Sequence, residues 1–240
     1  MTKIDIPTRT IKSYVRRSGR LTPGQKKALE QYWPLYGIDF QTEQPGVYQL
    51  AGEFKALKLE IGFGNGDALI SMAEKDPNSL YLGIEVHESG VGRCLTNIHQ
   101  QALPNVRLIR HDAIEVLQHM LPPQSLDRVF LFFPDPWHKK RHHKRRIVNQ
   151  RFRDLLSVLL KPGGCLHIAT DWQEYAEYMA AELLSDSRYM NSGDAKGYAQ
   201  RPAYRPATRF ENRGLKLGHG VWELIFEKPQ ERHMDSPEAG

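Results

Sequence analysis

Five acidic residues stand at the ends of short apolar runs, and their carboxylates together could bind a cation. The five are Glu60, Glu85, Asp112, Asp135 and Asp171. Their intervals are close to the ~30-residue length of a strand–helix–strand unit, so we expect the runs to be parallel strands of one sheet. Ligands bind beyond the carboxyl ends of such strands. Carboxylates on that rim would repel a phosphate-rich cofactor and attract a positively charged one.

A glycine-rich sequence, Glu-Ile-Gly-Phe-Gly-Asn-Gly-Asp over residues 60–67, closes the first apolar run. The dinucleotide fingerprint G-x-G-x-x-G would need glycine where this chain has Asp67. The spacing acid-x-Gly-x-Gly-x-Gly is instead similar to the cofactor loop of class I S-adenosylmethionine methyltransferases. That cofactor carries a sulfonium and an ammonium but no phosphate, so it suits an acidic rim. Glu85 would then bind both ribose hydroxyls. The alternative is a glycine turn with only a structural role.

The segment Phe-Pro-Asp-Pro-Trp over residues 133–137 follows the fourth apolar run. Two prolines fix φ on either side of Asp135 and hold its carboxylate off the strand end. An ionised aspartate only accepts hydrogen bonds, so it complements the N1–H and amino donors of guanine. The alternative is a rigid turn with an aromatic lid, in which Trp137 packs under the loop instead of stacking on a base.

Positive charge is concentrated in two segments, although the formal net charge is only +5. Residues 1–27 hold eight Lys/Arg against one acid, and residues 138–146 hold no acid. Such runs are often merely solvated. The second run, however, directly follows a rim carboxylate, which favours a polyanionic substrate, most simply nucleic acid. The cations around His138, His142 and His143 disfavour a metal site, so we expect no metal.

The apolar patterns predict the elements that must position these residues. Strands are expected at 57–61, 80–85, 106–109, 129–133, 165–170 and 221–227, and helices at 22–33, after Asp67 and at 147–160. A capping-box sequence starts the first helix at Thr22, and Pro34 is expected to end it. Together with the resemblance of the glycine loop, these expected strands and helices imply an α/β, Rossmann-like class I methyltransferase fold. Its sheet would be mostly parallel with an antiparallel C-terminal strand, and helices would cover both faces.

The chain divides into four segments. We expect a basic flexible N-terminal arm over 1–21, a helix and loop extension over 22–56, the methyltransferase domain over 57–228 and a disordered tail over 229–240. A length of 240 residues with 40% hydrophobic residues fits one α/β domain with extensions. No apolar run approaches the ~18–20 residues of a transmembrane helix, and no signal-peptide core is present. Cys94 and Cys165 are expected to be unpaired buried thiols of a cytoplasmic protein.

Six sequence motifs carry a close resemblance to a known family. They occupy residues 59–66, 83–86, 112–113, 133–142, 170–171 and 208–211. Through them the chain resembles the bacterial tRNA (guanine-N7-)-methyltransferases over roughly residues 9–228. The glycine loop is shared by many methyltransferases. The combination of Pro-Asp-Pro-Trp-His-Lys-Lys-Arg-His with Thr-Arg-Phe-Glu is far more specific.

The resemblance implies a cofactor, a substrate and a set of site residues. S-adenosyl-L-methionine would be the methyl donor, S-adenosyl-L-homocysteine the product, and N7 of a guanine in the variable loop of tRNA the methylated atom. The cofactor-binding residues would be Glu60, Gly62, Gly64, Glu85, Asp112 and Asp135. The residues that contact tRNA or its guanine would be Lys139, Asp171, Thr208, Arg209, Phe210 and Glu211. Glu85 would bind the ribose, Asp112 the adenine amino group, and Glu60 would lie near the methionine moiety. The sequence shows no obligate protein partner and no membrane contact, and it leaves monomer or homodimer open.

Methylation of guanine N7 requires no strong general base, because that nitrogen has a free lone pair. Catalysis should come chiefly from in-line positioning, which can contribute up to ~7–11 kcal/mol. Positive charge moves from the sulfonium onto the guanine during transfer. Asp135, as the catalytic residue, would orient the base and stabilise that charge.

Three other functions remain open from the sequence. A methyltransferase for another RNA, a protein or a small molecule would share the loop, although a non-RNA substrate leaves the two basic segments unexplained. A nicotinamide oxidoreductase would need the glycine spacing that is missing. A non-catalytic RNA-binding module would leave the phased carboxylates without a role. Incubation with labelled S-adenosylmethionine and unmodified tRNA separates these functions.

Overall fold

The computed structural model describes residues 11–15, 20–42, 52–207, 211 and 220–230. The elements in chain order are α1 (Pro23–Tyr36), β1 (Gly37–Ile38), β2 (Ala56–Ile61), α3 (Asp67–Lys75), β3 (Ser79–Ile84), α4 (Glu88–Gln100), β4 (Val106–Ile109), α5 (Ala113–His119), β5 (Leu126–Phe132), the 3₁₀ helix η1 (Lys140–Arg145), α6 (Gln150–Leu159), β6 (Leu160–Thr170), α7 (Gln173–Leu184), β7 (Met190–Asn191) and β8 (Trp222–Glu227). The expected strands and the helix after Asp67 are confirmed, with bounds that shift by up to five residues.

The strands form one eight-stranded sheet in the order β1-β4-β3-β2-β5-β6-β8-β7. The strands from β1 to β6 in this order are parallel, whereas β8 is antiparallel to β6 and to β7. This confirms a mostly parallel sheet with an antiparallel C-terminal strand. The chain leaves β2 for β3 on one side and later returns to β5 on the other. The point at which the strand order reverses therefore lies at the carboxyl end of β2, and an open α/β sheet binds its ligand at such a point.

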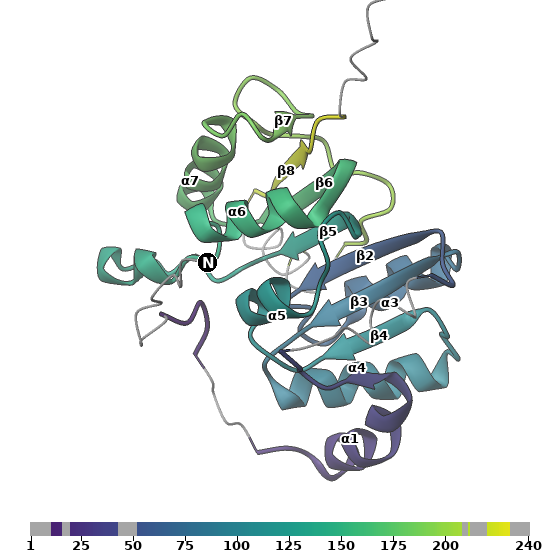
Figure 1. Cartoon of the computed structure of the whole chain (residues 1–240). Coiled ribbons are helices and arrows are strands. Elements are labelled where there is room, and N and C mark those ends of the chain that lie inside the picture. Colours follow the sequence, from purple (N-terminus) through teal and green to yellow (C-terminus); the bar gives the residue numbers. More distant parts are fainter. Residues whose placement is uncertain (1–10, 16–19, 43–51, 208–210, 212–219, 231–240) are drawn as a thin grey trace, which may run out of the picture.

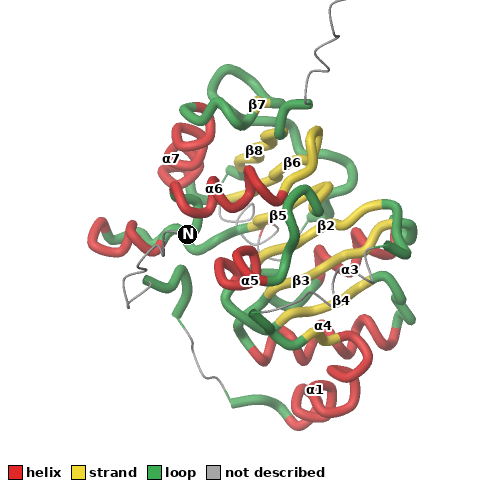
Figure 2. The backbone as a smooth tube through the Cα atoms, in the orientation of Figure 1, coloured by secondary structure: helices red, strands yellow, loops and turns green. Residues whose placement is uncertain are grey.

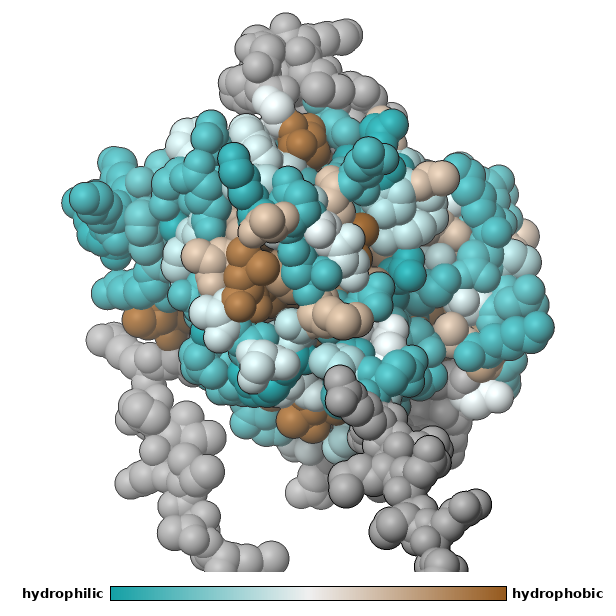
Figure 3. Space-filling view, turned by 90° about the horizontal axis from the view of Figure 1, so that it is seen from above, coloured by the Kyte–Doolittle hydropathy of each residue, from teal (hydrophilic) through white to brown (hydrophobic). Residues whose placement is uncertain are grey.

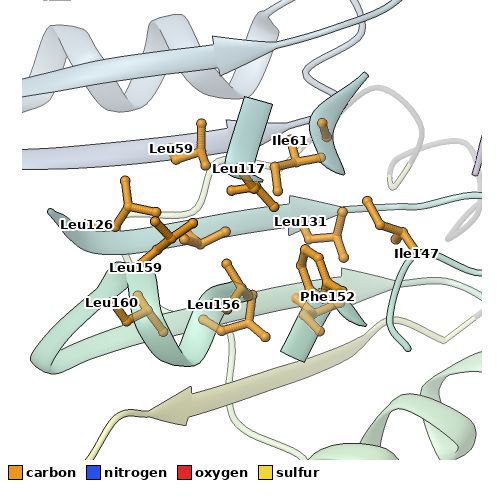
Figure 4. Packing of buried hydrophobic residues seen from close by; sticks show 14 of the residues in the cluster. Leu59, Ile61, Leu117, Leu126, Leu131, Ile147, Phe152, Leu156, Leu159 and Leu160 are labelled. Atoms are coloured by element: carbon orange, nitrogen blue, oxygen red, sulfur yellow. The ribbon is translucent and has the colours of Figure 1, made fainter. Parts of the chain in front are cut away.

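Two helical layers cover the sheet, and each buries one set of alternate strand residues (Figure 1). In β2, Leu57, Leu59 and Ile61 pack in the core shared with α5, α6 and α7, and Figure 4 shows this packing around Phe152. The opposite core is shared with α3 and α4 and includes Cys94. The α1 helix lies outside α4 and packs on it, with Tyr32 stacked on His99 at 4.1 Å between ring centroids.

The helix α1 begins as expected but ends later. The Thr22 hydroxyl accepts the Gln25 N–H, and the Gln25 side chain accepts the Thr22 N–H, which completes the capping box. The expectation that Pro34 ends the helix after Trp33 is wrong, because the helix continues to Tyr36. Proline in the last turn removes only its own N–H bond, and Gly37 still donates its N–H to the Trp33 carbonyl.

The helix expected over 147–160 is shorter than expected, in contrast to α1. It begins at Gln150, where the Asn149 side chain accepts the Phe152 N–H as an N-cap. The basic run before it forms the separate helix η1, which projects from the body of the molecule (Figure 1). The Lys-Pro-Gly-Gly sequence at 161–164 lies inside β6, where the pairing with β5 is irregular between Leu126 and Arg128.

The surface carries few large apolar side chains. Figure 3 shows one face with small apolar patches between hydrophilic side chains. Cys94 and Cys165 are buried and free, as expected. In the described part of the chain, no helix has the length and apolar character needed to span a bilayer. The arm that we expected to be flexible is described only at residues 11–15 and 20–21, and most of the expected disordered tail lies outside the described residues.

Candidate active site

The glycine loop turns sharply at the carboxyl end of β2. Gly62, Gly64 and Gly66 all have positive φ, with values of 73°, 58° and 83°. Gly66 is the N-cap of α3, and a Cβ there would lie 2.2 Å from Sγ of Cys94. Only glycine therefore fits position 66 without backbone strain and without displacement of the buried Cys94 side chain. The turn leaves Gly62 exposed at the strand end, facing open space.

A pocket of about 420 Å³ opens at this end of the sheet. Its walls are the carboxyl ends of β2, β3, β4 and β5 together with Ser13 and Tyr14 of the N-terminal segment. Among the expected cofactor residues, Gly62, Glu85 and Asp135 line it, whereas Asp112 lies beside the wall residues His111 and Ala113. The sheet topology thus brings these side chains together from different strands.

Glu85 is buried at the end of β3 and binds backbone donors on two sides. Its Oε2 accepts the Gly64 N–H at 3.0 Å, and its Oε1 accepts the N–H groups of Val86 and His87 at 2.6 and 3.0 Å. A carboxylate has about four lone-pair sites, so capacity for a ligand hydroxyl is left on a group that already fixes the loop. Glu85 both shapes the pocket and faces it.

Asp112 is held by two partners at the start of α5. Its Oδ1 accepts the Ile114 N–H at 2.9 Å, and its Oδ2 lies 3.0 Å from Nζ of Lys12. Lys12 also binds Oε1 of Glu115 at 2.6 Å. The Lys12 carbonyl accepts a 3.4 Å hydrogen bond from Arg145. The segment 11–15 therefore lies between α5 and η1 (Figure 2).

Glu60 lies behind the pocket instead of in its wall. Because Leu59 and Ile61 point into the core with α5–α7, Glu60 points to the α3–α4 side of the sheet. It is 3% exposed, and its Oε2 has no hydrogen-bond partner. Burial, reinforced by the nearby Glu85 charge, raises the pKa of Glu60 to about 8. A buried carboxyl with an unsatisfied oxygen fits a site that receives positive charge.

Asp135 occupies a strained turn that follows β5. Phe133 and Trp137, on either side of the Pro-Asp-Pro sequence, have φ values of 51° and 49°. Such left-handed conformations are costly for bulky residues and are concentrated at functional sites. The Phe133 N–H donates to the Ala169 carbonyl at 2.7 Å, which anchors the turn to β6. The exposed Asp135 side chain is thus presented by a rigid loop.

A second pocket, of about 460 Å³, adjoins the first and shares Asp135 and His87 with it. Its other lining residues include Trp137, His138 and Lys139. The Trp137 indole donates to the Ser13 carbonyl at 3.2 Å, and the Arg145 guanidinium lies 5.1 Å from the ring centroid. These contacts favour a packing role for Trp137. Lys139, in contrast, is exposed at the pocket edge as the N-cap of η1.

The basic residues after Asp135 divide into exposed and buried ones. Lys139, Lys140 and Arg141 are exposed, so they can reach an anionic partner. Arg146 is 2% exposed, donates to the Pro136 carbonyl at 3.0 Å and pairs with Glu174 on α7. Arg146 therefore supports the turn instead of facing solvent.

Of the remaining expected substrate residues, the structure describes only Asp171 and Glu211. Asp171 directly follows β6 and is partly buried. Thr208, Arg209 and Phe210 lie outside the described residues. Glu211 is 3% exposed and binds the Arg205 guanidinium through both carboxylate oxygens, at 2.8 and 2.9 Å.

Three residues that the sequence motifs did not indicate also reach this region. Lys12 pairs with Asp112, His87 lines both pockets, and Arg205 holds Glu211. His87 follows Glu85 closely, and that proximity to a predicted ligand was an available signal. Across the described ranges, no group of three or more His, Cys, Asp or Glu side chains is placed to hold a metal ion.

Comparison with known proteins gives both the family and the fold. Residues 55–224 match the family model described as putative methyltransferase. The chain is 51% identical over 222 residues to tRNA (guanine-N(7)-)-methyltransferases of Yersinia pestis (strain Pestoides F) and Escherichia coli (strain UTI89 / UPEC), covering 92% of this chain and 93% of each relative. A solved structure of an antibiotic-related methyltransferase aligns with a TM-score of 0.53 at 19% identity, covering 79% of this chain and 96% of that one. This likeness shows the methyltransferase fold.

Proposed function

The chain belongs to the tRNA (guanine-N(7)-)-methyltransferase family, and from this premise we propose that it transfers a methyl group from S-adenosylmethionine to N7 of a guanine in the variable loop of tRNA. The observation that supports this activity most directly is that Asp135 lines two adjoining pockets. One pocket would hold the methyl donor and the other the target guanine. Asp135 stands where the two ligands would meet.

The pocket residues fit a cationic, phosphate-free cofactor. Glu85 is placed to accept a ribose hydroxyl, and Asp112 the adenine amino group once Lys12 moves away. The buried Glu60, with its unsatisfied oxygen, would ionise in response to the positive charge of the methionine moiety. When bound, S-adenosylmethionine supplies an electrophilic methyl group on a sulfonium.

The second pocket and its surroundings fit an RNA nucleotide. Lys139, Lys140 and Arg141 would bind phosphates around the guanine, and the counterions released would make the affinity strongly dependent on salt. Asp171 and residues 208–211 would contact the base or the tRNA. A base buried in a variable loop must leave its stack to enter such a pocket.

Catalysis would depend on positioning and charge. Asp135 would accept hydrogen bonds from N1–H and the exocyclic amino group of guanine, which fixes the orientation of N7. The same carboxylate would stabilise the positive charge that the base acquires on methylation. The strained turn between Phe133 and Trp137 holds the carboxylate in place before the substrate binds, so little reorganisation accompanies the reaction.

The decisive experiment combines the purified protein with methyl-labelled S-adenosylmethionine and an unmodified tRNA transcript. Nuclease digestion should recover the label as N7-methylguanosine from the variable loop. A transcript in which the variable-loop guanines are replaced by adenine is the matched control and should stay unlabelled. Label in another base, or in the control transcript at the same rate, would contradict the proposed specificity. Absence of transfer to any RNA would contradict the activity itself.

A further inference from the structure

A buried network of charged side chains lies between β6, β8, residues 201–207 and Glu211, outside the pocket walls. Arg205 is 2% exposed, Glu211 3%, Glu223 4% and His167 0%. The Arg205 guanidinium binds both oxygens of Glu211 and pairs with Glu223, and His167 Nε2 lies 2.7 Å from Oε2 of Glu223. Arg205 is thus the cation between two buried carboxylates.

The network lies at the carboxyl edge of the sheet, next to the site. Glu223 pairs with Ala169 across the β8–β6 ladder, one residue before Thr170 ends β6. The Arg205 guanidinium also lies 5.7 Å from the Phe132 ring centroid and 5.9 Å from that of Phe133, within cation–π range. Both phenylalanines line the first pocket, and Phe133 opens the strained turn that carries Asp135.

Arg205 therefore contacts two parts of the site at once. The guanidinium binds Glu211, the last residue of the Thr-Arg-Phe-Glu sequence. It also contacts the ring of Phe133, the residue that opens the turn carrying Asp135. Buried ion pairs contribute little net stability, because desolvation of the charges offsets their attraction. Their planar, bidentate geometry does fix orientation, and only arginine offers such a fork.

We propose that Arg205 is a positioning residue for methyl transfer. It holds Glu211 at a fixed place relative to the Asp135 turn, so that the guanine and the methyl donor meet in line. The inference rests on the proposed function and adds a residue that contacts neither ligand. Lysine in its place would keep the charge but lose the fork, because an ammonium cannot bind both Glu211 oxygens in one plane and Glu223 as well.

The test is Arg205→Lys, measured by single-turnover methylation of tRNA and by calorimetric binding of S-adenosylhomocysteine. We expect the single-turnover rate at saturating tRNA to fall by about 10- to 10²-fold, the loss that a displacement near 1 Å can cause. Cofactor affinity should stay within about twofold, because Arg205 does not line the first pocket and meets its wall through the rings of Phe132 and Phe133. Arg201→Lys is the matched control. Arg201 also binds Glu211, at 3.1 Å, but its side chain is 49% exposed, so its rate should change little.

The variant Glu223→Gln keeps the experiment decisive if Arg205→Lys does not fold. It removes one anchor of the guanidinium and leaves the Arg205–Glu211 pair intact, so a smaller rate loss at unchanged cofactor affinity is expected. A folded Arg205→Lys variant with the wild-type rate overturns the proposal, and so does a parallel loss of rate and cofactor affinity in both variants, which indicates general destabilisation. A wild-type protein that methylates no tRNA would instead contradict the proposed function.

Discussion

The Nζ atom of Lys12 lies 3.0 Å from Oδ2 of Asp112, so a residue of the N-terminal segment neutralises a carboxylate beside the first pocket. Lys12 is 39% exposed at its side chain and Asp112 only 6%. The same segment provides backbone acceptors to Trp137, which precedes η1, and to Arg145, the last residue of η1. The proposed cofactor contact at Asp112 and the placement of the segment beside η1 are therefore linked in space.

This link predicts that Lys12→Met tightens cofactor binding. The variant frees Asp112 for the adenine amino group without altering the pocket wall. Because a half-exposed ion pair contributes ~0.2–1 kcal/mol, the dissociation constant of S-adenosylhomocysteine should fall by no more than about fivefold. Lys26→Met, at an exposed position on α1, is the control. Weaker binding in Lys12→Met would mean that Lys12 holds the cofactor instead of competing with it.

The second prediction concerns Glu85. Its carboxylate fixes the Gly64 N–H and two further N–H groups, so Glu85→Gln places an amide donor against at least one of these donors. We expect S-adenosylhomocysteine binding to weaken by about 1.5–3 kcal/mol, the range for a charge-assisted hydrogen bond. Glu88→Gln, at an exposed acid three residues further on, should bind normally. Equal affinity of the Glu85 and Glu88 variants in calorimetry would remove Glu85 from the cofactor site.

Most of the rim was predictable from the sequence because it depends on topology alone. Parallel strands that end in acids must gather those acids at one edge, and Glu85 and Asp135 do line the same pocket. The orientation of Glu60 was also readable, since alternation with Leu59 and Ile61 places it on the opposite face.

The contacts between distant segments were not predictable. Nothing in the spacing of the arm indicates that Lys12 meets residues about a hundred positions later. Arg205 likewise stands in an aperiodic stretch, and its burial depends on Glu223 of β8 and on Glu211. The basic run showed charge but no period, so its 3₁₀ conformation as η1 had no signal.

The third prediction follows from the buried Glu60. Its pKa is raised from 4.5 to about 8, so between these values the folded protein binds a proton that the unfolded chain has lost. Stability of the ligand-free protein should therefore fall as the pH rises from about 4.5 to about 8. Glu60→Gln should flatten this dependence and melt higher than wild type at pH 8. Thermal melts of both proteins at several pH values, without cofactor, measure how the stability of each depends on pH. Parallel curves for the two proteins would mean that Glu60 is ionised in the ligand-free fold.

The fourth prediction separates RNA binding from cofactor binding. Neutralisation of Lys139, Lys140 and Arg141 by glutamine should weaken tRNA binding and leave S-adenosylhomocysteine affinity unchanged. The salt slope should become shallower by ~0.7–0.9 for each phosphate that the variant no longer binds. Lys55→Gln with Lys75→Gln removes two charges at exposed positions near the amino ends of β2 and β3, and this control variant should retain most of its affinity for tRNA. A tRNA affinity that does not depend on salt would contradict the electrostatic explanation.

The last prediction concerns Asp135, the residue shared by both pockets. Asp135→Asn should keep the fold and the cofactor affinity, because the side chain is exposed and the turn is held by its prolines and by the Phe133 N–H bond. The asparagine amide would place a donor against a guanine donor and would remove the negative charge beside the methylated base. Removal of one preorganised electrostatic interaction typically costs ~10²–10³ in turnover.

Single-turnover assays at saturating cofactor and tRNA, with circular dichroism as the folding check, measure this decrease in rate. Glu30→Gln, at an exposed acid on α1, serves as the control for removal of a surface charge. Because N7 carries a free lone pair, no proton must leave the substrate before attack. The asparagine variant should therefore react more slowly at every pH, but its rate should depend on pH in the same way as that of the wild type. Near-normal turnover would reduce Asp135 to a residue of a rigid turn. A pH profile that loses a carboxylate limb would instead show that Asp135 acts as a general base.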